Sequence, residues 1–442
     1  MTDPRPARAE ADLLVTGISE LVTCAGRGPA RGAEQGAAAV VPRGAVAARR
    51  GRIVWVGPER DLPASVTALP GATRLDVGGR AVLPGLVDPH THLVWAGNRA
   101  DEFEQRLAGA TYSEIAARGG GILRTVAATR RADEATLLEL ALARLDRLAA
   151  RGATTIEVKS GYGLSTEAEL KILRVVREAA RRRPYRVVPT FLGAHTFPLE
   201  ARRSEASRRR YVEEVCEEML PAVVDEGLAR FADVFVDEHA FSLDEAAKVL
   251  GRARQLGLAV KVHADQLADD GAARLAADHE AASADHLEHA STEGLRALAA
   301  AGTIAVLIPG ASLFLRMNRY ARAREMIDLG VPVALATDLN PGTCPCESLP
   351  LVMQLGCLLC GLTVDEAIVA ATRNAAAAAG VGGEAGTIEP GKRCDLLVLD
   401  AEHRRDLLYA LGSARIHAVV AAGQVVAGRT PEETGGGDPV RA

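Results

Sequence analysis

The chain has 442 residues, of which 48% are apolar and 3% aromatic, and its formal charge is −5 with both signs interspersed. This charge balance argues against a nucleic-acid partner, which requires a basic face, and the low aromatic content argues against base-stacking platforms. Seven cysteines, an odd number in a long chain, do not indicate a disulfide framework. The N-terminus carries acidic residues and no apolar segment, so we expect a cytoplasmic protein without a secretory signal.

The predicted elements fall into three groups along the chain. Residues 11–80 hold short β-rich pieces separated by glycine, as in hairpins, and residues 386–426 repeat this pattern. Between them, eight apolar, β-branched segments predict strands at Ala81–Asp88, Thr154–Gly161, Arg186–Gly193, Ala232–His239, Leu258–Asp265, Ser283–His289, Thr303–Gly310 and Pro332–Gly342. Amphipathic segments predict helices at Glu134–Ala150, Thr166–Arg182, Arg209–Gly227, Asp244–Leu256, Leu267–Ala277, Glu293–Ala301 and Ala321–Leu329.

One uncharged stretch, Ala297–Leu315, has the composition of a membrane span. It is interrupted by Gly302, Pro309 and Gly310, which suit a spanning helix poorly. We therefore interpret it as the end of a helix followed by a buried strand, and we expect no membrane partner.

The alternation of strands and helices predicts an α/β fold made of parallel βα units. Eight such units predict a closed, TIM-like (β/α)8 barrel over residues 84–384. The flanks, residues 1–83 and 385–442, are expected to form one small composite β domain. Polar side chains cluster where the predicted barrel strands end, at the rim that carries the active site in such barrels.

The first of these polar groups is His90-Thr91-His92. On extended backbone, a spacing of two puts both imidazoles on the same side. A pair of this kind is weak evidence by itself, because neighbouring histidines often lie on a surface or make hydrogen bonds. Here an apolar segment delivers the pair to the rim, where His263 and Asp338 also follow strands. Three histidines and one carboxylate can hold one divalent metal ion, zinc or iron.

Several motifs carry a family resemblance. VLPGLVDPHTH, KVHAD and ATDLNPG resemble the amidohydrolase superfamily. Within it, HTHLVWAGNRADEFEQRLAG, GGGILRTV, IEVKSGYGL, TFLGAHTFP, SADHLEH and TDLNPGTCPCESL resemble the imidazolonepropionase family, whose members catalyse the third step of histidine breakdown. The resemblance extends from about residue 40 to 425. The His-x-His pair is shared across the superfamily, whereas the stretches around Arg99, Tyr162 and Asn340 are more specific.

The resemblance implies a metal-dependent hydrolase with a small-molecule substrate, 4-imidazolone-5-propanoate, whose cyclic C–N bond is opened to give N-formimidoyl-L-glutamate. It also implies a homodimer. The implied metal ligands are His90, His92, His263 and Asp338. Substrate contacts are expected from Arg99, Tyr162, His195, Gln266, Asn340, Gly342 and Thr343.

Three side chains are expected to take part in catalysis. Asp338 is predicted to accept a proton from the attacking water, and His286 or His195 could polarise the ring carbonyl or stabilise oxyanion charge.

The Arg99 guanidinium can bind a carboxylate through two hydrogen bonds, although a surface salt bridge with Asp101 or Glu102 is the alternative.

Gln266 departs from a pattern seen in related deaminases and in some imidazolonepropionases, which have a glutamate that shuttles protons at this position. Glutamine cannot exchange a proton at neutral pH, but it can hydrogen-bond to the ring. We therefore assign the base to Asp338, alone or with help from a histidine.

Two other functions are compatible with part of the sequence. A deaminase acting on a cytosine-like or guanine-like ring would share the four ligands, but Gln266 argues against it. A catalytically inactive scaffold would typically have lost metal ligands, and all four are present. The run Asp237-Glu238-His239 could hold a second metal, but its strand lacks the lysine that bridges two metals in binuclear relatives. The site is therefore predicted to be mononuclear.

Overall fold

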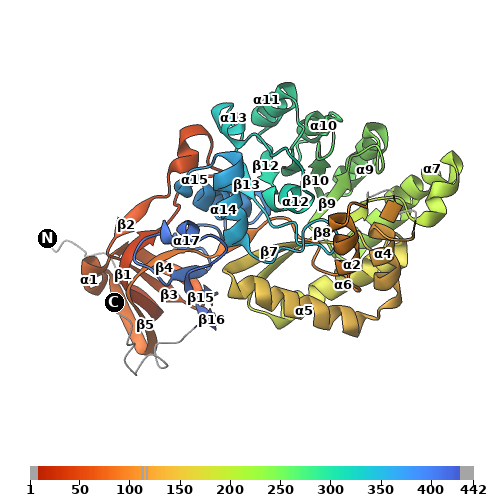
Figure 1. The fold of residues 1–442 in the computed structure, drawn as a ribbon. Helices are drawn as coiled ribbons and strands as arrows, with labels where there is room; N and C mark the ends of the chain where they lie inside the picture. The colour runs from red at the N-terminus through yellow and green to blue at the C-terminus, as the bar shows by residue number, and fades with distance from the viewer. Residues whose placement is uncertain (1–7, 111–113, 116–117, 429–442) are drawn as a thin grey trace.

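The computed structural model describes residues 8–110, 114–115 and 118–428. Within these ranges the chain forms two eight-stranded sheets. Figure 1 shows strands from both ends of the chain side by side at one end of the molecule, next to strands surrounded by helices. The α/β class and the barrel predicted from the sequence are confirmed.

The first sheet, here called the mixed sheet, joins both ends of the chain. Its order is β16-β15-β14-β5-β1-β3-β4, with β2 paired to β1. Only the β1–β5 pair is parallel, and the long β5 also pairs with β14 from the C-terminal part. The strands are β1 Ala9–Val22, β2 Val40–Pro42, β3 Gly44–Arg49, β4 Arg52–Pro58, β5 Val66–Pro84, β14 Leu396–Leu399, β15 Ile416–Ala421 and β16 Gln424–Gly428.

The second sheet is parallel throughout and runs in chain order from β6 to β13. Its strands are β6 Leu86–Asp88, β7 Ala153–Lys159, β8 Arg186–Ala194, β9 Phe231–Phe235, β10 Ala259–Ala264, β11 Ser283–His286, β12 Ile304–Leu307 and β13 Val333–Leu335. A parallel bridge between Thr91 and Leu339 joins the segments that follow β6 and β13, and so closes the barrel.

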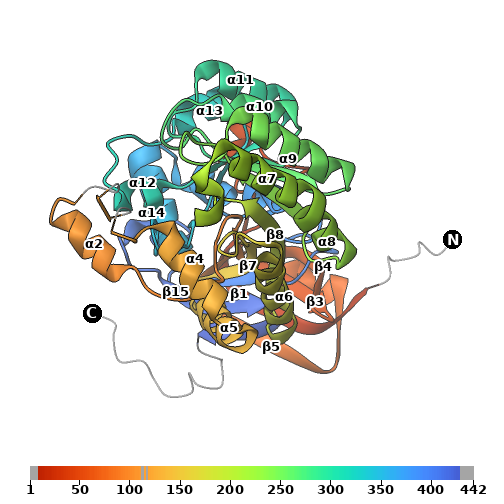
Figure 2. The ribbon, with the colours of Figure 1, turned by 90° about the vertical axis from the view of Figure 1, so that its right-hand side faces the viewer.

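Helices cover the outside of the barrel, and Figure 2 shows α5, α6, α9, α10 and α11 following one another around its strands. Those between barrel strands are α2 Ala100–Leu107, α4 Ile122–Arg131, α5 Glu134–Ala150, α6 Thr166–Arg182, α7 Glu205–Glu214, α8 Leu220–Asp225, α9 Leu243–Gln255, α10 Ala272–Asp278, α11 Thr292–Ala301, α12 Pro309–Phe314 and α13 Ala323–Asp328. The others are α1 Leu62–Ser65, α14 Leu349–Cys360, α15 Val364–Ala370, α16 Arg373–Ala378 and α17 Asp406–Tyr409.

The structure corrects the first predicted barrel strand. The segment Ala81–Asp88 is not one strand, because Ala81–Pro84 ends β5 of the mixed sheet and only Leu86–Asp88 enters the barrel. Gly85 lies at the crossing, where a Cβ atom would come within 2.3 Å of the Thr154 hydroxyl. The run looked continuous in the sequence because both sheets bury it.

A helix boundary also differs from the prediction. The helix expected at Leu267–Ala277 begins only at Ala272, because the Asp265 carboxylate accepts hydrogen bonds from the amides of Ala272 and Ala273 and so caps α10. By contrast, the uncharged stretch Ala297–Leu315 behaves as predicted, since α11 ends at Ala301 and β12 follows it. No helix in the described ranges is long and apolar enough to cross a bilayer.

The limits of the two predicted domains, at residues 84 and 384, stay a prediction. The first seven and last fourteen residues of the predicted small domain lie outside the described ranges.

Candidate active site

Barrel closure brings His90 and His92 next to Asp338. The Asp338 amide donates to the His90 carbonyl at 3.0 Å, and the His92 amide donates to the Leu339 carbonyl at 2.9 Å. Asp338 also has a positive φ of 51°, which is uncommon for a residue other than glycine and is often found at functional sites. Residues far apart in the sequence are thus held together by the backbone itself.

Three buried imidazoles converge at this position, and their ligand atoms lie within 4.8 Å of one another. His92 Nε2 lies 3.2 Å from His90 Nε2 and 3.5 Å from His263 Nε2. Asp338 Oδ1 lies beside two of them, 3.5 and 3.4 Å from the Nε2 atoms of His90 and His92. Ligands at about 2.1 Å from one ion in a tetrahedral arrangement are separated by roughly 3.4 Å, so the three histidines can hold a metal ion, and Asp338 stays the predicted fourth ligand.

Burial determines the charge of these groups. It lowers the pKa of His90 and His92 well below the ordinary histidine value, so both imidazoles are neutral and each can offer a lone pair to an ion. Burial also raises the pKa of the Asp338 carboxyl well above its usual range. A bound divalent ion would use all three side chains as ligands and favour the ionised carboxylate.

His195 and Tyr162 pack beside the metal-ligand candidates. The His195 ring stacks on His92 at 4.9 Å, and the Tyr162 ring lies 5.5 Å from His195. This packing needs glycine at 161, where φ is +107° and a Cβ atom would lie 2.9 Å from His195 Nδ1. His195 Nδ1 donates to the Gly161 carbonyl at 3.0 Å, and burial lowers its pKa to about 3. The neutral ring therefore carries its free lone pair on Nε2.

His286 approaches from the end of β11, where it and Leu287 both have positive φ values, of 80° and 70°. Its ring lies 5.4 Å from that of His263. His286 Nδ1 lies 4.0 Å from Glu288 Oε2, and the Ser312 hydroxyl donates to the other Glu288 oxygen at 2.7 Å. Burial raises the pKa of Glu288 to about 7.

The loop after β13 is shaped by the Asn340 side chain. Its carbonyl oxygen accepts hydrogen bonds from the amides of Gly342 and Thr343 at 2.9 and 2.7 Å, and from the Thr343 hydroxyl at 3.0 Å. Its amide nitrogen donates to the Asp338 carbonyl at 2.8 Å. Asn340 thus links this loop to the metal-ligand candidate, and its expected substrate contact stays a prediction.

Arg99 lies against the same loop. A Cβ atom at Gly342 would sit 2.0 Å from an Arg99 terminal nitrogen, so only glycine lets the guanidinium approach this closely. Arg99 Nε pairs with Glu102 at 2.8 Å, the partner foreseen by the alternative interpretation. The pair is not on the surface, however, since both side chains are at most 10% exposed. In the described part of the chain, the two terminal nitrogens have no protein hydrogen-bond partner and can face a ligand.

Comparison with known proteins identifies relatives of the chain. The model of the amidohydrolase family matches residues 81–426. Over 416 residues, the chain is 55% identical to the imidazolonepropionase of Symbiobacterium thermophilum, which covers 94% of this chain and 97% of that protein. It is 49% identical over 384 residues to the imidazolonepropionase of Bradyrhizobium diazoefficiens, with 87% and 94% covered.

The chain belongs to the imidazolonepropionase family of amidohydrolases. Solved structures with lower identity share its fold. A 5-methylcytosine deaminase from Klebsiella pneumoniae superposes with a TM-score of 0.71 at 17% identity, covering 97% of this chain and 99% of the other. An adenosine deaminase from Xanthomonas campestris gives 0.70 at 18% identity, covering 95% and 93%.

Gln266 is the remaining residue for which the sequence predicts a substrate contact. Its side chain is 8% exposed, two residues beyond the end of β10 and three beyond His263. Within the described ranges no protein group hydrogen-bonds to its amide, which leaves it available to a ring substrate.

Sequence reasoning missed two residues next to the metal-ligand candidates. Asp285 Oδ2 lies 2.6 Å from His90 Nδ1, and Asp233 Oδ2 lies 3.1 Å from His263 Nδ1. A signal was present for Asp233, which interrupts the otherwise apolar strand Phe231–Phe235. Asp285 gave no such signal, because its strand, Ser283–His286, is mostly polar.

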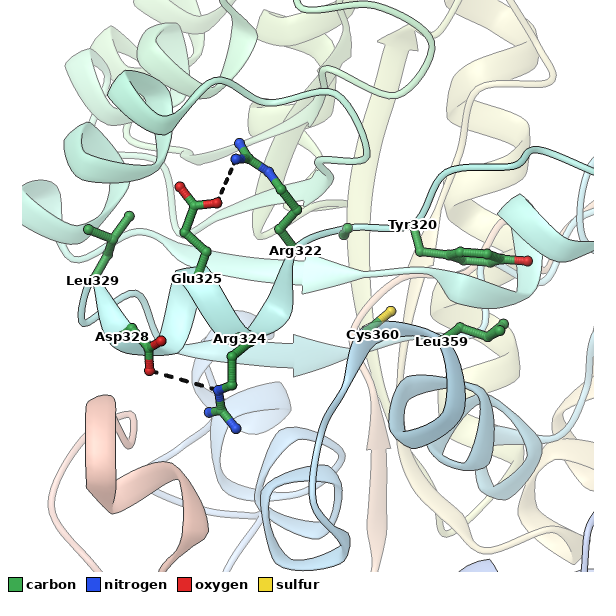
Figure 3. A pocket seen from close by; sticks show the side chains of 9 residues that line it. Tyr320, Arg322, Arg324, Glu325, Asp328, Leu329, Leu359 and Cys360 are labelled. Atoms are coloured by element: carbon green, nitrogen blue, oxygen red, sulfur yellow. Dashed lines mark hydrogen bonds and ion pairs between the residues drawn. The ribbon is translucent and has the colours of Figure 1, made fainter.

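A surface cavity of about 610 Å³ lies between α13 and α14. None of its lining residues belongs to the histidine cluster, by which we mean His90, His92, His195, His263 and His286. Figure 3 shows its charged side chains paired with one another, Arg322 with Glu325 and Arg324 with Asp328. With its charges compensated, this cavity offers no free ionic group for a ligand, and the histidine cluster remains the candidate site of chemistry.

Proposed function

We propose that the chain hydrolyses the cyclic C–N bond of 4-imidazolone-5-propanoate to N-formimidoyl-L-glutamate, a step of L-histidine degradation. One observation carries this proposal. Three imidazoles that converge beside the Asp338 carboxylate occur in a chain that is 55% identical to an imidazolonepropionase over nearly its whole length.

Each part of the reaction has a candidate group. A bound divalent ion would lower the pKa of a water molecule toward roughly 7. Asp338 accepts the proton of the attacking water and passes it to the leaving ring nitrogen. His286 donates a hydrogen bond to the ring carbonyl oxygen as negative charge develops there. His195 takes a different role, because its Nε2 lone pair suits it to accept a hydrogen bond from a ring N–H.

Substrate recognition is assigned to the other end of the site. The unengaged nitrogens of Arg99 bind the propanoate carboxylate through charge-assisted hydrogen bonds. Gly342 allows the guanidinium to approach, and Thr343 adds a polar contact from the same loop. Tyr162 packs against the ring, and Gln266 hydrogen-bonds to it.

The metal is assigned as one zinc or iron ion, because a site of three histidines and one aspartate suits both. Elemental analysis of the purified protein distinguishes them, and a stoichiometric ion also argues against a scaffold role. We further propose a homodimer in the cytoplasm, as expected for the family, and a division into a barrel and a composite β domain at residues 84 and 384.

The deciding experiment supplies metal-loaded protein with 4-imidazolone-5-propanoate and follows its consumption, with the product identified by mass spectrometry. We expect N-formimidoyl-L-glutamate to form in step with substrate loss. Protein that holds stoichiometric metal but consumes none of this substrate would falsify the proposal. Ammonia release from cytosine or guanine in a parallel assay would instead identify a deaminase.

A further inference from the structure

A group of charged side chains fills the barrel beneath the histidine cluster. It consists of Glu157 and Lys159 on β7, Asp233 on β9, Lys261 on β10 and Asp285 on β11, and all five are 0% exposed. We call these five residues the charged layer. Charged groups are rarely buried so completely, because desolvation costs more than an ordinary salt bridge returns. Their presence therefore calls for a reason other than stability.

Lys159 is the centre of the charged layer. Its Nζ lies 2.7 Å from Asp233, 3.0 Å from Glu157 and 3.5 Å from Asp285. Three of these residues come from alternate strands, β7, β9 and β11, as expected for side chains in one layer of a barrel interior. Lys261 completes the layer, with its Nζ 3.1 Å from Glu157 and 3.2 Å from the Pro89 carbonyl, next to His90.

The three carboxylates of the charged layer differ in the groups that they contact besides the lysines. Asp285 reaches His90 Nδ1 at 2.6 Å, and Asp233 reaches His263 Nδ1 at 3.1 Å. Glu157 instead accepts hydrogen bonds from Lys159 and the Thr190 hydroxyl. No contact between Glu157 and a histidine is found in the described part of the chain. One layer thus contains two carboxylates that touch metal-ligand candidates and one that does not.

We propose that Asp285 and Asp233 are positioning residues of the metal centre, each of which orients one histidine, and that Lys159 links the two. A carboxylate that accepts a hydrogen bond from Nδ1 keeps the proton there and leaves the Nε2 lone pair to bind the ion. In His90 and His263, Nε2 is the atom that approaches His92 Nε2, at the convergence point where the ion would bind. This inference rests on the metal-dependent function proposed above.

The charge of the layer supports the same conclusion. With all five groups ionised, two lysines against three carboxylates leave the charged layer with one negative charge. The Asp338 carboxylate would add a second negative charge at the rim when a bound cation keeps it ionised. A divalent cation at the convergence point would balance both, so the charged layer would favour an ion of charge +2 and lower the cost of burying its own residues.

The test compares Asp285→Asn and Asp233→Asn with Glu157→Gln as the matched control. All three remove one negative charge from the same layer, but only the first two change a carboxylate that touches a histidine. Affinity for Zn²⁺ is measured by competition with a chelator, and the visible spectrum of Co²⁺-loaded protein reports ligand geometry. No substrate is present, so failure of the proposed reaction cannot affect this result.

We expect both aspartate variants to bind Zn²⁺ about 10- to 100-fold more weakly and to have altered Co²⁺ spectra, while Glu157→Gln stays within about 3-fold of the parent protein. Equal losses in all three variants would overturn the proposal, because they would point to the charge of the layer alone. Unchanged affinity in both aspartate variants would overturn it as well.

A second measurement uses no variant, so it tests the proposal even if the substituted proteins do not fold. In the unaltered Zn²⁺-loaded protein, the Nδ1 protons of His90 and His263 should give far-downfield, slowly exchanging proton NMR signals. His90 Nδ1 is hydrogen-bonded to Asp285, and the buried His263 Nδ1 lies 3.1 Å from Asp233, which the proposal makes its acceptor in the metal-loaded protein. The absence of these signals would contradict the proposal.

Discussion

The two sheets have the same number of strands but very different interiors. The mixed sheet buries aliphatic side chains such as Val15, Ile18 and Leu396. The barrel, in contrast, buries the charged layer, with Lys159 at its centre, directly beneath the histidine cluster. Apolar burial stabilises a fold, whereas buried ion pairs contribute little or nothing net. The interior of the mixed sheet therefore stabilises the fold, whereas the barrel interior is organised for its site.

The largest effect is expected at the rim of the barrel, from Asp338→Asn. Loss of the proton acceptor should lower kcat by about 10²- to 10⁴-fold. The free energy of unfolding of the metal-free protein should not fall, because the burial that raises the pKa of Asp338 disfavours its charged form. Steady-state kinetics and urea unfolding measure the two quantities. Asp328→Asn, on an exposed side chain, is the control, and near-normal kcat in Asp338→Asn would remove the assigned base.

In the mixed sheet, a substitution is expected to lower stability and to leave kcat unchanged. Leu396→Ala truncates a fully buried side chain and should lower the free energy of unfolding by about 2–5 kcal/mol. Metal content and kcat of the folded fraction should stay unchanged. Leu411→Ala, at a 68% exposed position, should alter neither. A fall in kcat for folded Leu396→Ala would break the separation between the two sheets.

The buried Glu288 carboxyl near the site should make the free energy of unfolding depend on pH. Its folded pKa is raised by burial to about 7 from an ordinary value of 4.5. Between these pH values the unfolded chain has lost the proton that the folded chain keeps, so stability falls as pH rises through this window. The loss is about 1.4 kcal/mol per pH unit, or about 3 kcal/mol in total, and it levels off above pH 7.

Glu288→Gln should remove this part of the pH dependence. Urea unfolding of both proteins at pH 4.5 and pH 8 gives the comparison, and the parent protein serves as the reference at each pH. If the difference between variant and parent is the same at both pH values, the Glu288 carboxyl does not titrate in this window.

The smallest effect is expected at Arg99, where one interaction with the substrate is removed. Arg99→Ala should raise KM by about 10- to 100-fold, the range for a lost charged hydrogen bond, and should change kcat much less. Arg60→Ala is the control, because its side chain is 82% exposed and pairs with the exposed Asp61. An unchanged KM in Arg99→Ala would favour a structural role in the pair with Glu102.

The sequence by itself determined the order of elements and the residues at the strand ends. Strand and helix periodicities are local properties, so each of the seven predicted barrel segments after Ala81–Asp88 overlaps one barrel strand. Their ends are less exact: the last prediction, Pro332–Gly342, extends well beyond β13 Val333–Leu335. His90 and His92 could be paired from a spacing of two. His263 and Asp338 were added as candidate ligands because they also follow predicted strands, and the resemblance then implied the substrate residues.

Only the tertiary structure decided which distant groups meet. The Thr91–Leu339 bridge brings Asp338 to the histidine pair, and Gly85 divides one apolar segment between two sheets. The contacts of Asp285 and Asp233 depend on strand register around a closed barrel, which no local pattern encodes. The physical reason is that periodicity shows which face of an element is buried, whereas packing determines what that face touches.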